Sequence, residues 1–348
     1  MRHRSITIVI VSYNGRQYLP DCLASIQRQN YPVQLVRTVV IDNNSTDSTV
    51  GYVREAFPGI KIIANRNNPG FAANNQGYFL AQKWGSEYLV LLNQDTIVDS
   101  NWLARMVECA ESNRRIAAVQ AKLLLSPEKH LINSYGNSLH YLGFGYCNHY
   151  REEEYKLAGP AFDVLYPSGA AVLLRMSALA HTGLIDDKLF MYHDDVDLGW
   201  RLRLRDYKVM VEPRAVVYHK YSYSKAKYKF YYMERNRLIV MMENYRLGTL
   251  ILLLPMLKLM ELGLLLFAIK NGWIKEKLKG YWWILTHLRS IIKRRADVQF
   301  RLRKVKDREI LKLMTGSIKF QEIDSPLLRI MNPVMELYLK LVKMIIWW

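Results

Sequence analysis

Cysteine is scarce in this chain of 348 residues. The three that are present, Cys22, Cys109 and Cys147, show neither paired nor metal-type spacing. This argues against a secreted domain held together by disulfides and favours a reduced, cytosolic compartment. A secretory signal is also missing, since the apolar run ITIVIV is too short for its hydrophobic part and ends in SYNG.

Two common phosphate-binding loops are absent as well. The chain contains no G-x-G-x-x-G and no Walker loop, and the glycines of NPGFAANNQG have a different spacing. A Rossmann dehydrogenase and a P-loop enzyme are therefore disfavoured.

Acidic residues are in the minority, with 31 Asp and Glu against 49 Lys and Arg, for a net charge of +18. Residues 241–348 carry 20 of the basic residues and nine of the acidic ones. This basic, aromatic and apolar composition fits contact with anionic lipid or with nucleic acid. A solvated charged surface is the simpler alternative.

An uninterrupted apolar run of about 20 residues, which a membrane-spanning helix requires, is not found. The nearest run, 247–269, is interrupted by Pro255, Lys258 and Glu261. We therefore expect a re-entrant or interfacial hairpin kinked near Pro255. Residues 246–348 as a whole are expected to form a helical, basic, amphipathic region that associates with the membrane as a peripheral or monotopic element. A plain helical subdomain is the alternative.

The first part of the chain alternates strand-like and helix-like segments. Strands are predicted at 6–12, 35–42, 59–65, 87–93 and 117–125, with helices in each of the four intervals between them. A further strand ends the segment 167–174, a helix is expected at 194–206 and strand material at 208–219. From about residue 228 the pattern is helical. This alternation predicts an α/β fold with a mostly parallel central sheet flanked by helices.

Ligands of such sheets bind beyond the carboxyl ends of the strands. The residues expected there are polar: Ser12-Tyr13-Asn14, Asp42-Asn43-Asn44, Asn65 to Asn68, and Asn93-Gln94-Asp95. Asp42 can accept hydrogen bonds from a base or a ribose. The alternative is a turn that caps the next helix, which we prefer for Asp47.

Two further residues are candidates for metal binding. Asp95, helped by Asn93, can hold Mg²⁺ or Mn²⁺ beside a diphosphate, although the same pattern is also a common turn. His219 closes a predicted strand in a basic, tyrosine-rich neighbourhood. It is either a satisfied core histidine or a second metal ligand.

The motifs VSYNG, IDNNSTD, NPGFAANNQG, LLNQDT, GAAVLLR, FMYHDDVDLGWRLRLRDY, VVYHKYSYS and ERNR occur in this order between about residues 6 and 245. In this order and spacing the chain resembles the family-2 glycosyltransferases of GT-A fold, and within them the rhamnosyltransferase-like and galactofuranosyltransferase-like branch. The resemblance implies that residues 1–245 form the catalytic domain.

The resemblance also implies roles for individual residues. Asp95 would face a Mg²⁺ or Mn²⁺ ion, which His219 can join. Asp195 would be the general base, with Asp194 beside it. The donor nucleotide sugar would be bound by Ser12, Tyr13, Asp42, Asn44, Asn68, Gly70, Asn75, Asn93 and Gly169. The chain departs from the family pattern in two places: Asn93 replaces the first acid of D-x-D, and Asp194 replaces a glutamate.

The segment FMYHDDVDLGWRLR concentrates three carboxylates at a predicted helix start, where the helix dipole stabilises each by about 0.3–1 kcal/mol. Asp197 precedes Arg201 by four residues, which predicts a structural ion pair. Asp194 lies at or near the N-cap and either caps the helix or touches the acceptor. Asp195 is expected to stay ionised at neutral pH, as a base must be. We expect Phe190, Met191 and Tyr192 to close one wall of the acceptor pocket.

The implied reaction is inverting sugar transfer by a single displacement. The donor is a nucleotide-diphosphate sugar, with rhamnose as the first expectation, and the acceptor is a hydroxyl of a lipid-linked or polysaccharide glycan. We expect the protein at the cytoplasmic face of the cell membrane, in contact with anionic lipid, and assembly as a homo-oligomer is left open.

Two alternatives were weighed. A sugar nucleotidyltransferase needs a basic loop after the first strand, where only Arg16 is available. A nucleic-acid-binding protein could use the basic, tyrosine-rich segment 219–237 and the basic tail. However, acidic strand ends repel phosphate in the absence of a metal, so no nucleic-acid partner is expected.

Overall fold

The computed structural model describes residues 3–157, 159–221, 226–319 and 326–348. Its main sheet has the strand order β10-β12-β6-β11-β4-β1-β2-β3, with β5 paired to β12 and β7 paired to β6. The strands of this sheet are β1 (Ile6–Ser12), β2 (Val36–Asp42), β3 (Lys61–Ala64), β4 (Tyr88–Asn93), β5 (Thr96–Val98), β6 (Ile116–Leu125), β7 (Ile132–Ser134), β10 (Phe162–Asp163), β11 (Ala171–Arg175) and β12 (Lys208–His219).

The sheet is mostly parallel, as predicted. Strands β3, β2, β1 and β4 are parallel neighbours, β6 is parallel to β12, and β11 runs antiparallel between β4 and β6. The five predicted strands of the first part of the chain, and the two at 167–174 and 208–219, are confirmed within a few residues. A separate two-stranded sheet pairs β8 (Asn137–Leu139) with β9 (Gly145–Cys147).

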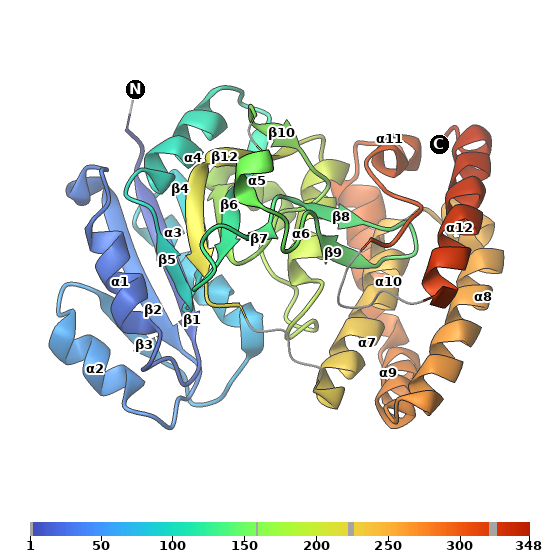
Figure 1. Ribbon diagram of the computed structural model, residues 1–348, viewed down its shortest axis with the longest axis horizontal. Coiled ribbons are helices and arrows are strands. Elements are labelled where there is room, and N and C mark those ends of the chain that lie inside the picture. The colour runs from blue at the N-terminus through green and yellow to red at the C-terminus, as the bar shows by residue number, and fades with distance from the viewer. Residues whose placement is uncertain (1–2, 158, 222–225, 320–325) are drawn as a thin grey trace.

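Helices cover both faces of the sheet (Figure 1). Successive residues of β1 point to opposite faces, as a period of two requires: Ile8 packs in the core with α1, α2 and α4, and Val9 packs in the core with α3, α5 and α6. These helices are α1 (Leu19–Gln27), α2 (Thr49–Ala56), α3 (Asn74–Lys83), α4 (Trp102–Glu111), α5 (Met176–Thr182) and α6 (Asp194–Leu204). The predicted helix at 194–206 is therefore confirmed.

The C-terminal third is helical and forms the right-hand part of the molecule in Figure 1. Its elements are α7 (Lys227–Asn244), α8 (Leu247–Lys270), α9 (Ile274–Thr286), α10 (Leu288–Ala296), a π-helical turn (Asp297–Leu302), α11 (Asp307–Lys312) and α12 (Pro326–Ile345). One hydrophobic core joins these helices to α6 and to the segment 139–142. The expected domain boundary after residue 245 therefore falls inside a shared core.

The expected hairpin kinked near Pro255 is wrong. Helix α8 continues through Pro255 over 24 residues, because Leu253 and Met256 on either side of the proline pack into the shared core and hold the helix together. Glu261, which we expected to interrupt the apolar run, points into the protein instead. Its carboxylate pairs with Arg237 and lies 3.0 Å from Lys277 Nζ.

Candidate functional site

The carboxyl ends of β1 and β4 are joined by Gln94. Ser12 Oγ donates a hydrogen bond to Gln94 Oε1 over 2.7 Å, and the backbone N–H of Tyr13 donates to the same oxygen over 3.1 Å. A Cβ atom on Gly15 would lie 2.3 Å from this oxygen and 2.3 Å from Ser12 Oγ, so a larger residue would displace both side chains. Gln94 was not among the predicted site residues, although it lies in the polar segment that was expected to end β4.

Asp42 is buried at the end of β2, and its carboxylate holds the following turn. Asp42 Oδ2 accepts a hydrogen bond from Ser45 N over 2.9 Å, and Oδ1 accepts one from Ser45 Oγ. This is the turn interaction that we weighed as the alternative, but each carboxylate oxygen keeps a further lone pair for a ligand. Asn44 is exposed beside it with a left-handed φ of 65°.

Asn43 is buried and connects the ends of β2 and β3, a role that the sequence did not indicate. Its Nδ2 donates to Asn68 Oδ1 over 3.1 Å and to Gly70 O over 3.0 Å. Its Oδ1 accepts a hydrogen bond from Asn65 Nδ2 over 3.1 Å. Asn68 and Gly70, which were predicted to bind the nucleotide sugar, are thereby fixed at the same sheet edge as Asp42.

Gly70 brings this edge into contact with the loop before α6, about 120 residues later. Its φ is 65°, and a Cβ atom there would lie 2.1 Å from Phe190 O. The neighbouring Phe71 N donates to Phe190 O over 2.8 Å. Asn75 was also expected to bind the nucleotide sugar. Its Nδ2 instead donates hydrogen bonds to Ile185 O and Asp187 Oδ1, and its Oδ1 accepts one from Ile185 N, so Asn75 positions this loop.

The structure brings Asp95 and His219 together. Strand β5 pairs with β12 so that His219 faces Thr96, which sets His219 beside Asp95. His219 Nε2 lies 3.2 Å from Asp95 Oδ1, and His219 Nδ1 lies 2.9 Å from Asn133 Oδ1. The sequence thus named two residues that lie 124 positions apart in the chain and are neighbours in the fold.

This pair is suited to a metal ion. If Nδ1 carries the ring proton and donates a hydrogen bond to the Asn133 oxygen, Nε2 of a neutral imidazole presents a lone pair to the Asp95 carboxylate. Two lone pairs at this distance need a proton or a cation between them. The described residues contain no group of three or more His, Cys, Asp and Glu that could hold a metal. A Mg²⁺ or Mn²⁺ ion here would therefore take much of its coordination from a diphosphate and water.

Asp195 lies in the first turn of α6, next to the loop that precedes β11. Its Oδ1 accepts a hydrogen bond from Val196 N over 2.8 Å, and Gly169 N approaches its Oδ2 at 3.4 Å. Burial raises the pKa of Asp195 to about 6, against the opposing effect of these N–H groups. The carboxylate is thus largely ionised at pH 7 and basic enough to take a proton. Ala170 O accepts a hydrogen bond from Asn93 N over 2.9 Å, which joins this loop to the end of β4.

The other two aspartates of the cluster differ from Asp195. Burial, and then the charge of Asp195, raise the pKa of Asp194 well above its ordinary value, which favours its protonated form. Asp197 is fully buried and accepts hydrogen bonds from Arg201 Nε over 2.8 Å and Asn244 Nδ2 over 3.2 Å. The predicted ion pair between Asp197 and Arg201 is confirmed.

The loop before α6 has a costly backbone conformation. Phe190, Tyr192 and His193 all have φ near 60°, which costs about 1–3 kcal/mol for each non-glycine residue. Buried Asn236 of α7 holds this loop, because its Nδ2 lies 2.7–2.9 Å from the carbonyl oxygens of Leu189, Met191 and Tyr192. Asn236 lies in the ERNR motif, but the sequence did not indicate this role.

The family model described as "Glycosyltransferase like family 2" matches residues 3–239 of the chain. This protein belongs to that family. Helix α6, the pair of Asp95 and His219 and the polar strand ends all lie within the matched residues. The family 2 chain described here therefore combines its family's domain with a helical C-terminal part.

Curated relatives and solved structures are also similar to this chain. The poly-beta-1,6-N-acetyl-D-glucosamine synthase of Staphylococcus epidermidis is 26% identical over 216 residues, which are 61% of this chain and 48% of that protein. The chain thus spans about half the length of the curated relatives it matches. The structure of S. aureus TarS 1-349 in complex with UDP matches with a TM-score of 0.53 and 16% identity, over 98% of this chain and 90% of that one.

A third match is the mannosyltransferase PcManGT from Pyrobaculum calidifontis in complex with GDP-Man and Mn2+. It covers 99% of this chain and 87% of that one, with a TM-score of 0.51 and 14% identity. At such low identities the two solved structures bear on the fold alone, and they support a GT-A-like fold. The narrower branch that the motifs suggest stays a prediction.

Proposed function

We propose that this protein transfers a sugar from a nucleotide-diphosphate sugar to a hydroxyl of a glycan acceptor, with inversion at the anomeric carbon. The observation that carries the proposal is the environment of Asp195. It is a carboxylate with a pKa of about 6, on a helix whose preceding loop contacts Gly70 at the polar sheet edge. The family match supports this function over nucleic-acid binding and nucleotidyl transfer. Part of the basic segment 219–237, residues 222–225, lies outside the described residues.

The mechanism follows from the positions of the side chains. The oxygen of the acceptor hydroxyl attacks the anomeric carbon while Asp195 accepts the proton of that hydroxyl. The nucleoside diphosphate leaves from the opposite face of the carbon. Ser12, Tyr13, Asp42, Asn44, Asn68 and Gly70 line the sheet edge proposed to hold the nucleotide. A divalent ion held by Asp95 and His219 would neutralise charge on the leaving diphosphate. The neutral form of Asp194 avoids a second negative charge beside the base.

Two donors are the best candidates. The motif resemblance favours dTDP-rhamnose. The name of the Staphylococcus epidermidis relative refers to a polymer of N-acetylglucosamine, which makes UDP-N-acetylglucosamine the second candidate. The complexes of the solved relatives with UDP, and with GDP-Man and Mn2+, support a nucleotide-diphosphate sugar and a divalent ion in general.

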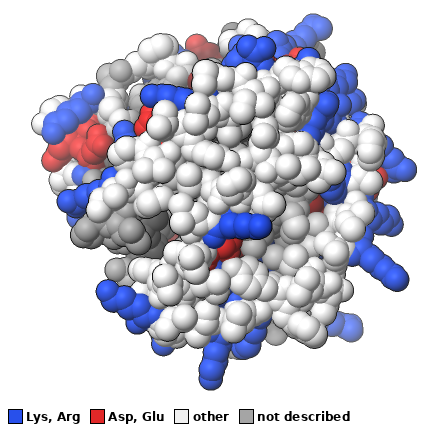
Figure 2. Space-filling model, turned by 90° about the vertical axis from the view of Figure 1, so that its right-hand side faces the viewer, with Lys and Arg blue, Asp and Glu red and all other residues white. Residues whose placement is uncertain are grey.

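The C-terminal helices support attachment to a membrane, and we propose that this is the cytoplasmic face of the cell membrane. Helix α8 has the length and composition of a membrane-crossing helix, yet little of it is buried in the protein. Figure 2 shows a broad face largely without charged side chains, with most Lys and Arg at its margins. Exposed apolar residues of α8 and α12 include Ile251, Leu262, Leu266, Leu337, Leu341 and Met344. Glu261 pairs with Arg237 and Lys277, which ties one face of α8 to the protein and leaves the apolar face exposed. We therefore propose that α8 lies against the membrane as a monotopic element.

A donor screen tests the proposed function. Purified protein is incubated with dTDP-rhamnose, UDP-N-acetylglucosamine and GDP-mannose, and release of the nucleoside diphosphate is measured with Mg²⁺, with Mn²⁺ and after chelation. We expect turnover of one donor that requires the metal ion. Activity that survives complete chelation would remove the metal role from Asp95 and His219. Absence of turnover with every donor would contradict the proposed function.

A further inference from the structure

A groove of about 950 Å³ lies between the start of α7 and helix α9. We call it the α7/α9 groove. Its lining is mainly aromatic and basic, and includes Tyr228, Tyr231, Tyr232, Lys279, Trp282 and Trp283. None of the residues expected from the sequence to bind the donor or the metal lines it.

The α7/α9 groove is in direct contact with the loop before the catalytic helix. The ring of Tyr232 stacks on Phe190 with 4.9 Å between the ring centres. Arg235 lies beneath the groove, with its guanidinium 4.4 Å from the Trp283 ring, and donates a hydrogen bond to Lys188 O over 2.6 Å. A ligand in the groove therefore lies next to the loop that leads to Asp195.

The lining has the chemistry of a site for a phosphorylated sugar. Aromatic rings offer flat apolar surfaces on which the C–H faces of sugar rings stack, and the nearby hydroxyl groups can bond to sugar hydroxyls. Lys275 and Lys279 lie one turn apart on α9 and are both exposed, and Glu276 is the one acidic residue among the described residues that line the groove. Two ammonium groups at this spacing suit a diphosphate.

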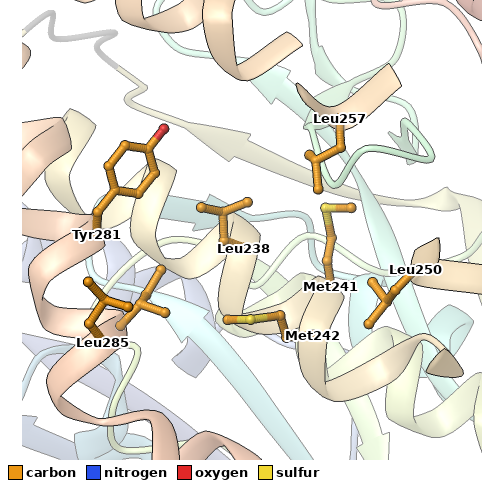
Figure 3. Close-up of a pocket in the computed structure, with 8 residues that line it drawn as sticks. Leu238, Met241, Met242, Leu250, Leu257, Tyr281 and Leu285 are labelled. Carbon is orange, nitrogen blue, oxygen red and sulfur yellow. The ribbon is translucent and has the colours of Figure 1, made fainter. Parts of the chain in front are cut away.

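An apolar crevice of about 330 Å³ lies on the other flank of α9 (Figure 3). Its walls come from α7, α8 and α9 and include Leu238, Met242, Leu257 and Leu285. Trp282, which lines the groove, and Leu285, which lines the crevice, are 68% and 66% exposed, so an apolar surface on α9 connects the two hollows.

We propose that the acceptor is a glycan linked to a lipid through a diphosphate, and that it binds along α9. The glycan lies in the α7/α9 groove, the diphosphate contacts Lys275 and Lys279, and the start of the lipid chain lies in the apolar crevice. This assignment rests on the proposed function, because it names the acceptor class of that reaction. It accounts for a basic and aromatic groove that joins the catalytic loop to an apolar surface.

The test uses binding, so that it does not depend on turnover. Farnesyl diphosphate is titrated into the full-length protein in detergent, and tryptophan fluorescence is recorded. We expect saturable binding that weakens by roughly tenfold or more in the double variant Lys275→Glu/Lys279→Glu, since two charge-assisted contacts are lost. The matched control Lys258→Glu, on the exposed face of α8, should bind as the wild type does. Wild-type protein that shows no saturable binding, or equal weakening in the control, would overturn the proposal.

A second measurement separates the groove from general contact with lipid. Trp282→Ala should weaken binding of farnesyl diphosphate, whereas Trp347→Ala, which removes an equally exposed tryptophan after α12, should not. The same effect in both variants would contradict a specific site. If the wild type binds the probe but turns over no donor, the proposed function fails while the lipid-diphosphate site stands.

Discussion

At the scale of single residues, the three aspartates at the start of α6 divide their roles by environment. Asp197 is neutralised by Arg201, Asp194 favours its protonated form, and Asp195 keeps a raised but accessible pKa of about 6. Asp195, the proposed base, is thus the one member of the cluster that is both ionised at pH 7 and not already paired with a cation.

Asp195→Asn should lower sugar transfer by about 10²–10⁴-fold, because the proton acceptor is lost. In the wild type the rate should fall as the pH drops below about 6, where Asp195 becomes protonated. Initial rates between pH 5 and 8 measure this. The control Asp206→Asn, just beyond the far end of the same helix, should keep normal rates. A wild-type rate that is flat down to pH 5 would exclude Asp195 as the base.

The same variant should not be less stable at pH 8. Because the pKa of Asp195 is higher in the folded than in the unfolded protein, its protonated form stabilises the fold at a pH below the unfolded pKa. This contribution is lost as the pH rises through about 6. At pH 8 the buried charge is therefore a cost, which asparagine removes. Equal or higher thermal stability of Asp195→Asn, together with lost activity, would distinguish a missing base from a damaged fold.

At the scale of elements, the loop before α6 depends on helix α7 through Asn236. In Asn236→Leu the carbonyl oxygens of Leu189, Met191 and Tyr192 lose their common donor, which we expect to cost about 1–3 kcal/mol. The loop should relax from its left-handed conformations, so kcat should fall more than the affinity for the donor. Thermal unfolding and steady-state kinetics measure both effects. Asn271→Ala, which removes one exposed hydrogen bond to Phe267 O, is the control and should change neither.

Helix α7 also carries a buried carboxylate that sets a pH dependence of stability. Burial, and then the charges of Asp197 and Asp186, raise the pKa of Glu243 to about 8. The protonated form stabilises the fold at low pH, and this contribution is lost as the pH rises through about 8. Glu243→Gln should therefore unfold at a higher temperature than the wild type at pH 9 and show little gain at pH 5. The surface control Glu309→Gln should follow the wild type at both values.

The sequence predicted the elements of the sheet and their polar ends because burial and period-two patterns are local. It also named Asp95, His219 and the pair Asp197 and Arg201, since residue type and spacing carry that information. Gln94, Asn43 and Asn236 were missed as site residues. Their roles arise from hydrogen bonds to groups far away in the chain, which no local pattern shows. The prediction for Pro255 failed because the core contacts of Leu253 and Met256, which hold the helix together across the proline, are made with residues far away in the chain.

At the scale of the whole molecule, the apolar face of α8 and α12 predicts attachment to lipid. The double variant Leu262→Glu/Leu266→Glu places two charges on the exposed face of α8, which should release the protein from vesicles containing anionic lipid. Flotation of vesicles on a density gradient measures the bound fraction. The control Phe79→Glu alters an exposed apolar residue of α3 and should leave binding unchanged. Retention of the double variant on vesicles would argue that α8 is not the attachment face.

The ion cluster beneath α8 has a consequence for how this enzyme is organised. Arg237 and Glu234 of α7 pair with each other at 3.1 Å, and the cluster is completed by Glu261 of α8, which pairs with Arg237, and Lys277 of α9, whose Nζ lies 2.6 Å from Glu234 Oε2. If the chain were cut after residue 245, this cluster would lose Glu261 and Lys277, and the apolar core that α7 shares with the later helices would be exposed to water. The C-terminal helices, which we propose to contact lipid, are thus not a detachable part of the protein. We therefore expect the loop before α6, its supporting helix α7 and helices α8 and α9 to fold together as one unit.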